Sequence, residues 1–217
     1  MSKSWKVRVA GNGEVSVLHE ESTSGEPTAT FVCAHGAGGN MHDRGMQAVA
    51  KELRGRGVDV VRFNFPYSEK KNGRPDPMPL LRATIEAVMS EVSHEGKLLI
   101  GGRSMGGRAA SMMAADHVQA DGLLLLAYPL HPAGKPEQLR DAHLPSITIP
   151  ALCLNGTRDA FCRRDLMEVV LPRLHRTFEM HWLEGADHSF HVLKSSGRTD
   201  SDVLSEIGAT TTAWLQA

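Results

Sequence analysis

Short apolar runs alternate along the chain with longer segments in which apolar residues recur every three or four positions. The runs predict β-strands and the longer spacing predicts amphipathic helices. The predicted inner strands are residues 29–34, 58–64, 97–101, 122–127, 151–155 and 178–183. The predicted helices are residues 44–54, 80–94, 105–116, 165–175 and 202–216. This alternation is typical of an α/β protein whose central sheet is mostly parallel, with helices on both faces.

The first two β-rich runs differ from the others because a tight turn joins them in place of a helix. Residues 5–9 and 14–18 flank Gly11-Asn12-Gly13, and such glycine- and asparagine-rich turns are typical of hairpins. We therefore expect an antiparallel hairpin at one edge of the sheet.

Two longer connections, residues 66–79 and 131–150, are rich in proline and are expected to be surface loops. The second is expected to hold one short helix near residues 136–143, which is too small for a lid domain. Because no repeat or shift in composition marks a boundary, residues 1–217 are expected to form a single domain.

Composition and charge exclude several classes of protein. The 24 Lys and Arg residues and 25 Asp and Glu residues leave a net charge of −1, which argues against a partner that is nucleic acid or an anionic membrane. The longest apolar run, residues 123–127, is far shorter than the roughly 20 residues of a membrane-spanning helix. The N-terminal residues lack the apolar core of a signal peptide. We therefore expect a cytoplasmic monomer or homodimer.

The three cysteines, Cys33, Cys153 and Cys162, are an odd number and lack the spacing of metal ligands. Reduced thiols fit this pattern better than a disulfide framework. Cys33 and Cys153 lie in predicted strands and are expected to be small buried residues.

The motif with the clearest chemistry follows the strand at residues 97–101. Gly102-Arg103-Ser104-Met105-Gly106 matches the G-x-S-x-G pattern of a nucleophile elbow. The pattern alone is weak, but an apolar strand precedes it and a helix rich in small residues follows. Such an elbow lifts the Ser104 hydroxyl to the head of a helix, where the helix dipole favours developing negative charge. The alternative is a glycine-rich turn without chemistry.

A serine nucleophile needs a base, and the base needs a third group that orients it. Asp159 and His188 each follow a predicted parallel strand by a few residues. Both should therefore reach the carboxyl edge of the sheet, where Ser104 also lies. This position favours His188 among the 11 histidines. His191 is the alternative base, and Asp187, which is expected to shape the turn, is the alternative orienting group.

The strand at residues 29–34 runs into a second glycine-rich loop, His35-Gly36-Ala37-Gly38-Gly39. Such a loop supplies one backbone N–H of an oxyanion hole. We assign the two oxyanion donors to the N–H groups of Ala37 and Met105, and expect the His35 side chain to brace the loop. The nucleophile, the base and the donors are then all present in the chain, so no metal or organic cofactor is implied.

The loops after the strands supply candidate walls of a substrate pocket. These are Met41, Phe65, Tyr67, Leu130, Phe161 and Phe190. Arg103, Arg108 and Arg158 flank the candidate catalytic positions. Ion pairs at the surface are the favoured interpretation of these arginines, and attraction of an acidic substrate is the alternative.

With these motifs in this order, the chain resembles a small lidless α/β-hydrolase of the dienelactone-hydrolase-like group. More narrowly, Gly101-Gly102-Arg103-Ser104-Met105-Gly106-Gly107-Arg108 and Tyr128-Pro129-Leu130-His131-Pro132 are similar to a subgroup of predicted hydrolases related to a testis-expressed protein and a chromatin-complex subunit. The resemblance implies the α/β-hydrolase fold and its catalytic triad. Dienelactone hydrolase itself has a cysteine nucleophile where this chain has Ser104, which argues against transferring its substrate.

The sequence thus predicts a serine hydrolase that cleaves a small carboxylic ester or thioester through an acyl-enzyme on Ser104. Asp159 orients His188, which serves as general base and general acid. Amide cleavage uses the same residues and is not separated by them. The alternative is a binding or scaffold protein that keeps the fold without useful turnover.

Overall fold

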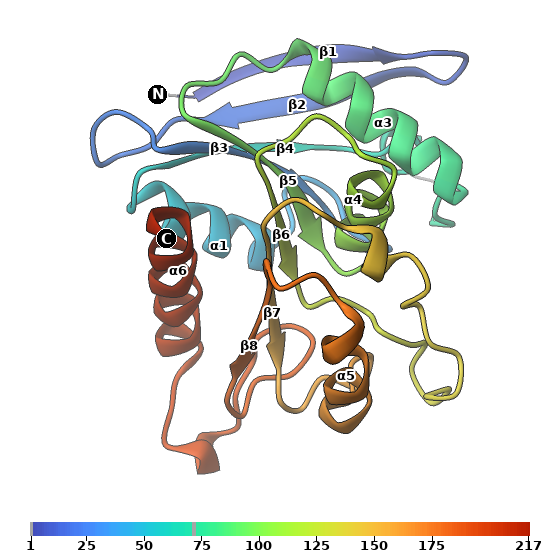
Figure 1. Ribbon diagram of the computed structural model, residues 1–217. Coiled ribbons are helices and arrows are strands. Elements are labelled where there is room, and N and C mark those ends of the chain that lie inside the picture. Colours follow the sequence, from blue (N-terminus) through green and yellow to red (C-terminus); the bar gives the residue numbers. More distant parts are fainter. Residues whose placement is uncertain (1, 71–72) are drawn as a thin grey trace.

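A sheet of eight strands forms the centre of the computed structural model, which describes residues 2–70 and 73–217 (Figure 1). The strands are β1 (Ser2–Val9), β2 (Gly13–Glu20), β3 (Ala29–Ala34), β4 (Val58–Phe63), β5 (Lys97–Arg103), β6 (Gly122–Leu126), β7 (Ala151–Gly156) and β8 (Phe178–Leu183). Their order in the sheet is β1-β2-β4-β3-β5-β6-β7-β8. β1 pairs antiparallel with β2, and β2 with β4, whereas the pairs from β4–β3 to β7–β8 are parallel. The expected mostly parallel sheet with an antiparallel N-terminal hairpin is confirmed.

Helices cover both faces of this sheet (Figure 1). They are α1 (Arg44–Arg54), α2 (Pro66–Glu69), α3 (Met78–Glu91), α4 (Met105–Ala115), α5 (Arg164–Val170) and α6 (Asp200–Gln216), with short 3₁₀ turns η1 (Leu144–Ser146), η2 (Leu171–Arg173) and η3 (Lys194–Ser196). α1 and α6 pack on one face, and α3, α4 and α5 pack on the other. The two faces enclose two apolar cores, one on each side of the sheet.

Strands β3, β4, β6 and β7 are buried along their whole length because both of their faces are covered. In β3, every residue is buried, and its side chains alternate between the two cores. Val32 packs in the core under α3 and α4, whereas Phe31 and Cys33 pack in the core under α1 and α6. A continuous apolar run is therefore the pattern that such a strand requires. The prediction of residues 178–183 as an inner strand is wrong, because β8 is the last strand of the sheet and is only partly buried.

Two of the predicted connections differ from expectation. The connection at residues 66–79 begins with α2, whose Pro66 and Tyr67 are buried; residues 71 and 72 lie outside the described residues. The helix expected near residues 136–143 is wrong, and a single 3₁₀ turn, η1, follows that segment instead. The Arg140 N–H donates to the Leu130 carbonyl at 2.7 Å, so this segment lies along the chain after β6 and its backbone hydrogen bonds are not those of a helix.

The helix expected at residues 165–175 is also shorter than predicted. It ends at Val170, and the 3₁₀ turn η2 follows with a proline in its first turn. Proline has no N–H to donate and clashes with a preceding helical turn, so it ends the regular helix there.

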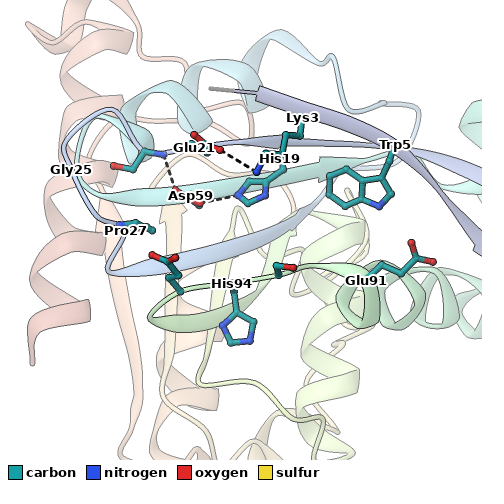
Figure 2. A pocket seen from close by; sticks show the side chains of 12 residues that line it. Lys3, Trp5, His19, Glu21, Gly25, Pro27, Asp59, Glu91 and His94 are labelled. Carbon is teal, nitrogen blue, oxygen red and sulfur yellow. Dashed lines mark hydrogen bonds and ion pairs between the residues drawn. The ribbon is translucent and has the colours of Figure 1, made fainter.

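A hollow of about 740 Å³ lies at the amino ends of β3, β4 and β5 (Figure 2). Trp5, His19 and Asp59 line it, and His19 Nε2 lies 2.8 Å from Asp59 Oδ2. No residue of the predicted triad lines this hollow, because the triad belongs to the opposite, carboxyl edge of the sheet.

Over residues 2–70 and 73–217, none of the helices is both long and apolar enough to cross a membrane.

Candidate active site

Ser104 stands in a strained backbone conformation between β5 and α4. Its φ is 50° and its ψ is −115°, and it occupies the N-cap position of α4. A residue with a side chain adopts such angles only where the surrounding structure enforces them, and such strain clusters at functional sites. The Ser104 N–H donates to the Leu126 carbonyl of β6 at 2.9 Å, which holds the elbow against the neighbouring strand.

The glycines on either side of Ser104 are required by the close approach of β3. A Cβ on Gly102, whose φ is +138°, would lie 2.1 Å from the Ala34 carbonyl oxygen. A Cβ on Gly106 would lie 2.6 Å from the same oxygen. Only glycine lets the strand, the turn and the start of α4 pass this close to β3.

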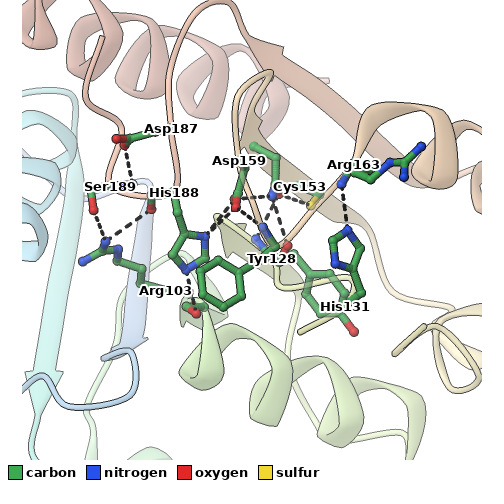
Figure 3. Close-up of polar contacts among 12 residues, drawn as sticks. Arg103, Tyr128, His131, Cys153, Asp159, Arg163, Asp187, His188 and Ser189 are labelled. Carbon is green, nitrogen blue, oxygen red and sulfur yellow. Dashed lines mark hydrogen bonds and ion pairs between the residues drawn. The ribbon is translucent and has the colours of Figure 1, made fainter. Parts of the chain in front are cut away.

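The structure brings Ser104, His188 and Asp159 together in one hydrogen-bonded series. Figure 3 shows the side of the His188 ring that faces Asp159. His188 Nε2 lies 2.9 Å from Ser104 Oγ. On the other side of the ring, His188 Nδ1 lies 2.9 and 2.8 Å from the two carboxylate oxygens of Asp159. With the ring proton on Nδ1 and donated to Asp159, Nε2 is free to accept the Ser104 hydroxyl proton.

The Asp159 carboxylate is fully buried and is held by other donors besides His188. The Phe161 N–H donates to its Oδ1 at 2.8 Å, and Asn155 Nδ2 donates to its Oδ2 at 3.1 Å. Hydrogen bonds of this kind compensate for the loss of hydration of a buried charge. They also fix the orientation of the carboxylate that faces the imidazole.

Asn155 was not singled out from the sequence, and it connects two loops of the site. Its Oδ1 accepts from the Tyr128 N–H at 2.9 Å, and its Nδ2 donates to the Tyr128 carbonyl at 3.0 Å. Asn155 thereby joins the end of β7 to the loop after β6, in addition to holding Asp159. The available signal was a polar residue closing an otherwise apolar strand, since such a residue needs partners when it is buried.

The turn that carries His188 is shaped by Asp187. One carboxylate oxygen of Asp187 accepts from the Ser189 N–H at 2.7 Å and from the His191 N–H at 3.0 Å. Asp187 thus has the turn-forming role expected from the sequence. The alternative base, His191, points to Asp200, with 3.0 Å between His191 Nδ1 and each carboxylate oxygen. This hydrogen bond raises the pKa of His191.

Arg103, immediately before Ser104, is hydrogen-bonded to the turn that carries His188. Its Nη2 donates to the His188 carbonyl at 3.2 Å and to Ser189 Oγ at 3.1 Å (Figure 3). Its Nη1 lies 3.6 Å from Asp43, the N-cap of α1. One guanidinium therefore joins the elbow, the histidine turn and the start of α1.

The loop of the predicted oxyanion hole lies against the elbow. A Cβ on Gly36 would come within 3.5 Å of the Ser104 Cβ, so the two loops are in direct contact. Within residues 2–70 and 73–217, the N–H groups of Ala37 and Met105 have no acceptor. Met105 is the first residue of α4, so its N–H belongs to the positive end of the helix dipole.

His35 is buried and braces this loop, as expected. Its Nδ1 lies 2.8 Å from the Gly36 carbonyl oxygen, and its Nε2 accepts from the Phe65 N–H at 3.2 Å. Burial lowers the pKa of His35. A neutral ring with its proton on Nδ1 satisfies both contacts.

Comparison with known proteins identifies the family. Residues 27–216 match a family model described as an alpha/beta hydrolase domain. The chain belongs to this α/β-hydrolase family. Its fold is similar to that of an alpha-beta serine hydrolase homologue from Coxiella burnetii, with 21% identity, 96% of both chains covered and a TM-score of 0.77.

Two other solved structures share this α/β-hydrolase fold. A serine hydrolase without a lid from Xanthomonas campestris is 22% identical over 100% of this chain and 96% of that chain, with a TM-score of 0.76. Dienelactone hydrolase from Anabaena variabilis is 18% identical over 100% of this chain and 97% of that chain, with a TM-score of 0.73. Together with the family match, these likenesses support a hydrolase at the general level.

Most of the predicted pocket residues of this α/β-hydrolase fill its cores. Phe65 and Leu130 are fully buried, and Met41, Tyr67 and Phe190 are nearly so. Phe161 is partly exposed, and its ring centroid lies 4.4 Å from that of His188. Of the six residues, Phe161 is therefore the one whose ring packs on the predicted triad, and a pocket built from the others stays a prediction.

The three arginines near the predicted triad have different partners. Arg103 is paired with Asp43, whereas Arg158 Nη1 donates to the Gly185 carbonyl at 3.0 Å. Arg108 makes no ion pair with any of residues 2–70 or 73–217. The expectation of ion pairs therefore fits Arg103 and is wrong for Arg108 and for Arg158, which also has no ion pair within the described residues.

The three cysteines are buried and free. Burial raises the pKa of the Cys33 thiol to about 12 and raises the pKa of Cys153 and Cys162 as well. Because the thiolate is the reactive form, these buried thiols are poor nucleophiles, and the elbow position belongs to Ser104.

Proposed function

We propose that this α/β-hydrolase is a serine hydrolase that cleaves a small carboxylic ester or thioester through an acyl-enzyme on Ser104. The observation that carries the proposal is the placement of the His188 ring. Its Nε2 lies 2.9 Å from Ser104 Oγ, while its Nδ1 lies 2.8 Å from the buried carboxylate of Asp159. This arrangement activates a serine and keeps the imidazole in the tautomer that accepts the serine proton.

In the first half of the reaction, Ser104 Oγ attacks the carbonyl carbon of the substrate and its proton passes to His188 Nε2. The carbonyl oxygen takes up the negative charge, and the N–H groups of Ala37 and Met105 stabilise it. An oxyanion donor of this type contributes about 10²–10³ in kcat. Asp159 stabilises the positive imidazolium until His188 returns the proton to the departing alcohol or thiol.

In the second half, water attacks the acyl-Ser104 ester while His188 Nε2 accepts a proton from the water. The tetrahedral intermediate then collapses, the bond between the acyl carbon and Ser104 Oγ breaks, and His188 returns the proton to Ser104. One water is consumed, and one carboxylic acid and one alcohol or thiol are released.

The proposal includes a reducing, cytoplasmic setting and a small-molecule substrate, with the protein acting as a monomer or homodimer and without nucleic acid or membrane. A net charge of −1 and three free, buried cysteines support it, since disulfides are rare in reducing compartments. The segments at residues 101–108 and 128–132 support the narrower kinship with the subgroup related to a testis-expressed protein and a chromatin-complex subunit.

A fluorophosphonate probe, which reacts with activated serines, tests this function. We expect it to label the wild-type protein and to leave Ser104→Ala unlabelled. The matched control is Ser90→Ala at an exposed serine of α3, which keeps full labelling. If folded wild-type protein, verified by circular dichroism, stays unlabelled and hydrolyses no model ester, the proposal is overturned in favour of a binding or scaffold protein.

A further inference from the structure

The peptide bond between Gly36 and Ala37 connects the proposed oxyanion donor to the rest of its loop. In a trans peptide the carbonyl and the N–H lie in one plane and point in opposite directions. The groups that hold the Gly36 carbonyl therefore also set the direction of the Ala37 N–H. This peptide lies against the elbow, since a Cβ on Gly36 would come within 3.5 Å of the Ser104 Cβ.

Within residues 2–70 and 73–217, three donors surround the Gly36 carbonyl oxygen. His35 Nδ1 lies 2.8 Å from it, and the Gly39 N–H donates to it at 3.1 Å. The Tyr67 hydroxyl donates to it at 3.3 Å. The peptide is thus held from its carbonyl side, which leaves the Ala37 N–H on the other side for a ligand.

The His35 ring acts on this carbonyl as a donor. Its Nε2 accepts from the Phe65 N–H at 3.2 Å, so the proton of the neutral ring is on Nδ1. Burial lowers the pKa of His35, so the ring stays neutral near pH 7 and keeps this tautomer. The Nδ1–H group then donates to the Gly36 carbonyl.

Tyr67 reaches the same carbonyl from α2. Its side chain is nearly fully buried, and its ring packs on that of His35 with 5.7 Å between the centroids. Its N–H donates to Asp76 Oδ2 at 2.9 Å, which fixes the start of α2. Burial raises the pKa of Tyr67, so the hydroxyl keeps its proton. A buried hydroxyl that donates to a loop carbonyl acts on the loop and not directly on a substrate.

α2 holds the loop at a second point, outside the donor peptide. Ser68 Oγ donates to the Gly39 carbonyl at 3.1 Å. The peptide between Gly39 and Asn40 contains neither of the N–H groups assigned to the oxyanion hole. Tyr67 and Ser68 are adjacent, so their variants separate an effect on the donor peptide from an effect on the loop as a whole.

We propose that Tyr67 and His35 are positioning residues of the oxyanion hole, which aim and polarise the Ala37 N–H through the Gly36 carbonyl. This inference rests on the proposed function and adds residues that act on its transition state without touching the substrate. Hydrogen bonds accepted by a carbonyl polarise the amide, which makes the N–H of the same peptide a stronger donor. A stronger donor stabilises the oxyanion more than the uncharged carbonyl of the bound substrate, so it raises kcat and leaves KM nearly unchanged.

Tyr67→Phe tests the inference because it removes the hydroxyl and keeps the ring. We expect kcat for phenyl acetate to fall about fivefold, as for one lost hydrogen bond, and KM to change by less than about twofold. The matched control is Tyr128→Phe, since Tyr128 is the other tyrosine of the chain and its hydroxyl also donates to a backbone carbonyl, that of Arg140, at 2.6 Å. We expect this control to keep the wild-type kcat. An equal loss in both variants would assign the effect to buried hydroxyls in general and overturn the inference.

Ser68→Ala is the control for the loop as a whole. It removes the hydrogen bond to the Gly39 carbonyl and leaves the donors of the Gly36 carbonyl in place. We expect its kcat to stay within about twofold of the wild type. A loss as large as that of Tyr67→Phe would mean that any contact between α2 and the loop has the same effect, and the specific role of Tyr67 would be refuted.

The identity of the carbonyl atom gives a readout that a general loss of stability does not move. In the thiono analogue of phenyl acetate, sulfur replaces the carbonyl oxygen and is a weaker hydrogen-bond acceptor. We expect kcat/KM of the wild-type protein to favour the oxygen ester, and this preference to fall about fivefold in Tyr67→Phe. Equal losses for the two esters would show that Tyr67 does not act through the oxyanion donor.

Two variants of His35 test the second positioning residue. In His35→Asn the short side-chain amide can donate from the place of Nδ1, whereas in His35→Gln the longer side chain reaches the place of Nε2 and this donor is lost. We expect kcat to fall about 30-fold in His35→Gln and less than about tenfold in His35→Asn. An equal or larger loss in His35→Asn would overturn the role of the Nδ1–H group. Urea unfolding checks the fold of both variants, and the tyrosine variants decide the inference if either fails to fold.

The two proposals fail in different ways. If the wild-type protein reacts with the fluorophosphonate probe and hydrolyses phenyl acetate, while Tyr67→Phe keeps its kcat and its preference for the oxygen ester, the positioning role is overturned and the serine hydrolase stands. If folded wild-type protein neither reacts with the probe nor hydrolyses the ester, the proposed function is overturned and the positioning role with it.

Discussion

Arg103 and Arg108 lie on either side of the nucleophile elbow, and their surroundings differ. The terminal nitrogens of Arg103 contact the His188 carbonyl, Ser189 Oγ and the Asp43 carboxylate. Arg108 has no such partner among residues 2–70 and 73–217, and in this part of the chain the Nε of each of the two arginines is buried without a hydrogen-bond partner. The terminal donors of Arg103 hold parts of the protein together, whereas no ion pair within the described residues offsets the charge of Arg108.

The same contrast separates the turn that carries His188 from the segment that holds Arg140. The His188 turn is held by Asp187, Arg103 and the buried Asp159, so its geometry is overdetermined. The segment with Arg140 is held through its backbone, and within residues 2–70 and 73–217 no carboxylate pairs with its side chain. We therefore expect changes to the contacts of the histidine turn to lower turnover, and changes at Arg108 to act through its charge on neighbouring groups such as His143.

The largest effect is expected from Asp159→Asn. The amide cannot hold His188 in the tautomer that accepts the Ser104 proton, and in a serine protease the equivalent change lowers kcat by about 10⁴. Steady-state kinetics on a neutral model ester measures this loss. The matched control is Asp187→Asn, because Asp187 adjoins His188 and the amide oxygen of the new side chain can still accept from the Ser189 and His191 N–H groups that shape the turn. Turnover by Asp159→Asn close to that of the wild type would move the orienting role to another residue.

The next effect concerns the close approach of the elbow to β3. In Gly106→Ala, the new methyl group would lie 2.6 Å from the Ala34 carbonyl oxygen. We expect the free energy of unfolding to fall by about 4 kcal/mol, because only strong steric conflicts cause a loss of this size. Urea unfolding followed by circular dichroism measures it.

Gly134→Ala separates the steric conflict from backbone strain. Gly134 has a φ of +71° and nothing within 4 Å of a Cβ, so its change is expected to cost only about 1 kcal/mol. Equal losses for the two variants would show that close contact with β3 is not what requires Gly106.

Much of the fold was predictable because local patterns decide it. The strands at residues 29–34 and 178–183 and the helix at residues 44–54 have the predicted bounds. The buried run at residues 29–34, the alternation of apolar and polar residues that begins at Phe178, and the apolar stripe of the helix are sufficient signals for these elements. The segment at residues 136–143 was predicted wrongly because its conformation depends on a hydrogen bond to Leu130 that no local pattern reveals.

The candidate site was also predictable only in part. Ser104, Asp159 and His188 could be selected because each follows the carboxyl end of a parallel strand, and such ends meet at one edge of the sheet. The contacts of Asn155 and Arg103 could not be predicted, since they join loops that are distant in the sequence. Pocket walls were the least predictable, because an apolar residue after a strand fills a core as readily as it faces a ligand.

A smaller effect on turnover is expected from Arg103→Met. Loss of its hydrogen bonds to the His188 turn lets the imidazole drift from Ser104, and a small misplacement of a catalytic group costs about 10–100-fold. We expect kcat to fall within this range while KM changes little, and Arg103→Lys to recover part of the loss. Arg158→Met, which loses one hydrogen bond to the Gly185 carbonyl, is the control. An increase in KM with unchanged kcat would place Arg103 in substrate binding.

The smallest expected effect is a pH dependence of the free energy of unfolding, which arises from His143 near Arg108. Burial and the charge of Arg108 lower the pKa of His143 to about 4 in the folded protein, whereas an unfolded histidine has a pKa of about 6.5. As the pH falls from about 6.5 to about 4, the unfolded chain takes up this proton and the folded chain does not, so stability decreases. His143 is only partly buried, so we expect a loss of about 1 kcal/mol.

His143→Gln removes this proton uptake and should reduce the decrease in stability between pH 7 and pH 4.5, measured by urea unfolding at both values. Arg108→Gln should reduce it in part, because the guanidinium is one cause of the lowered pKa of His143. Arg103→Gln removes an equal charge from the other side of the elbow and should leave the decrease unchanged, since Arg103 is not among the groups that act on His143. If the two arginine variants reduced the loss of stability equally, the pKa of His143 would depend on the net charge of the protein. Arg103 and Arg108 would then not differ in their electrostatic effect on His143.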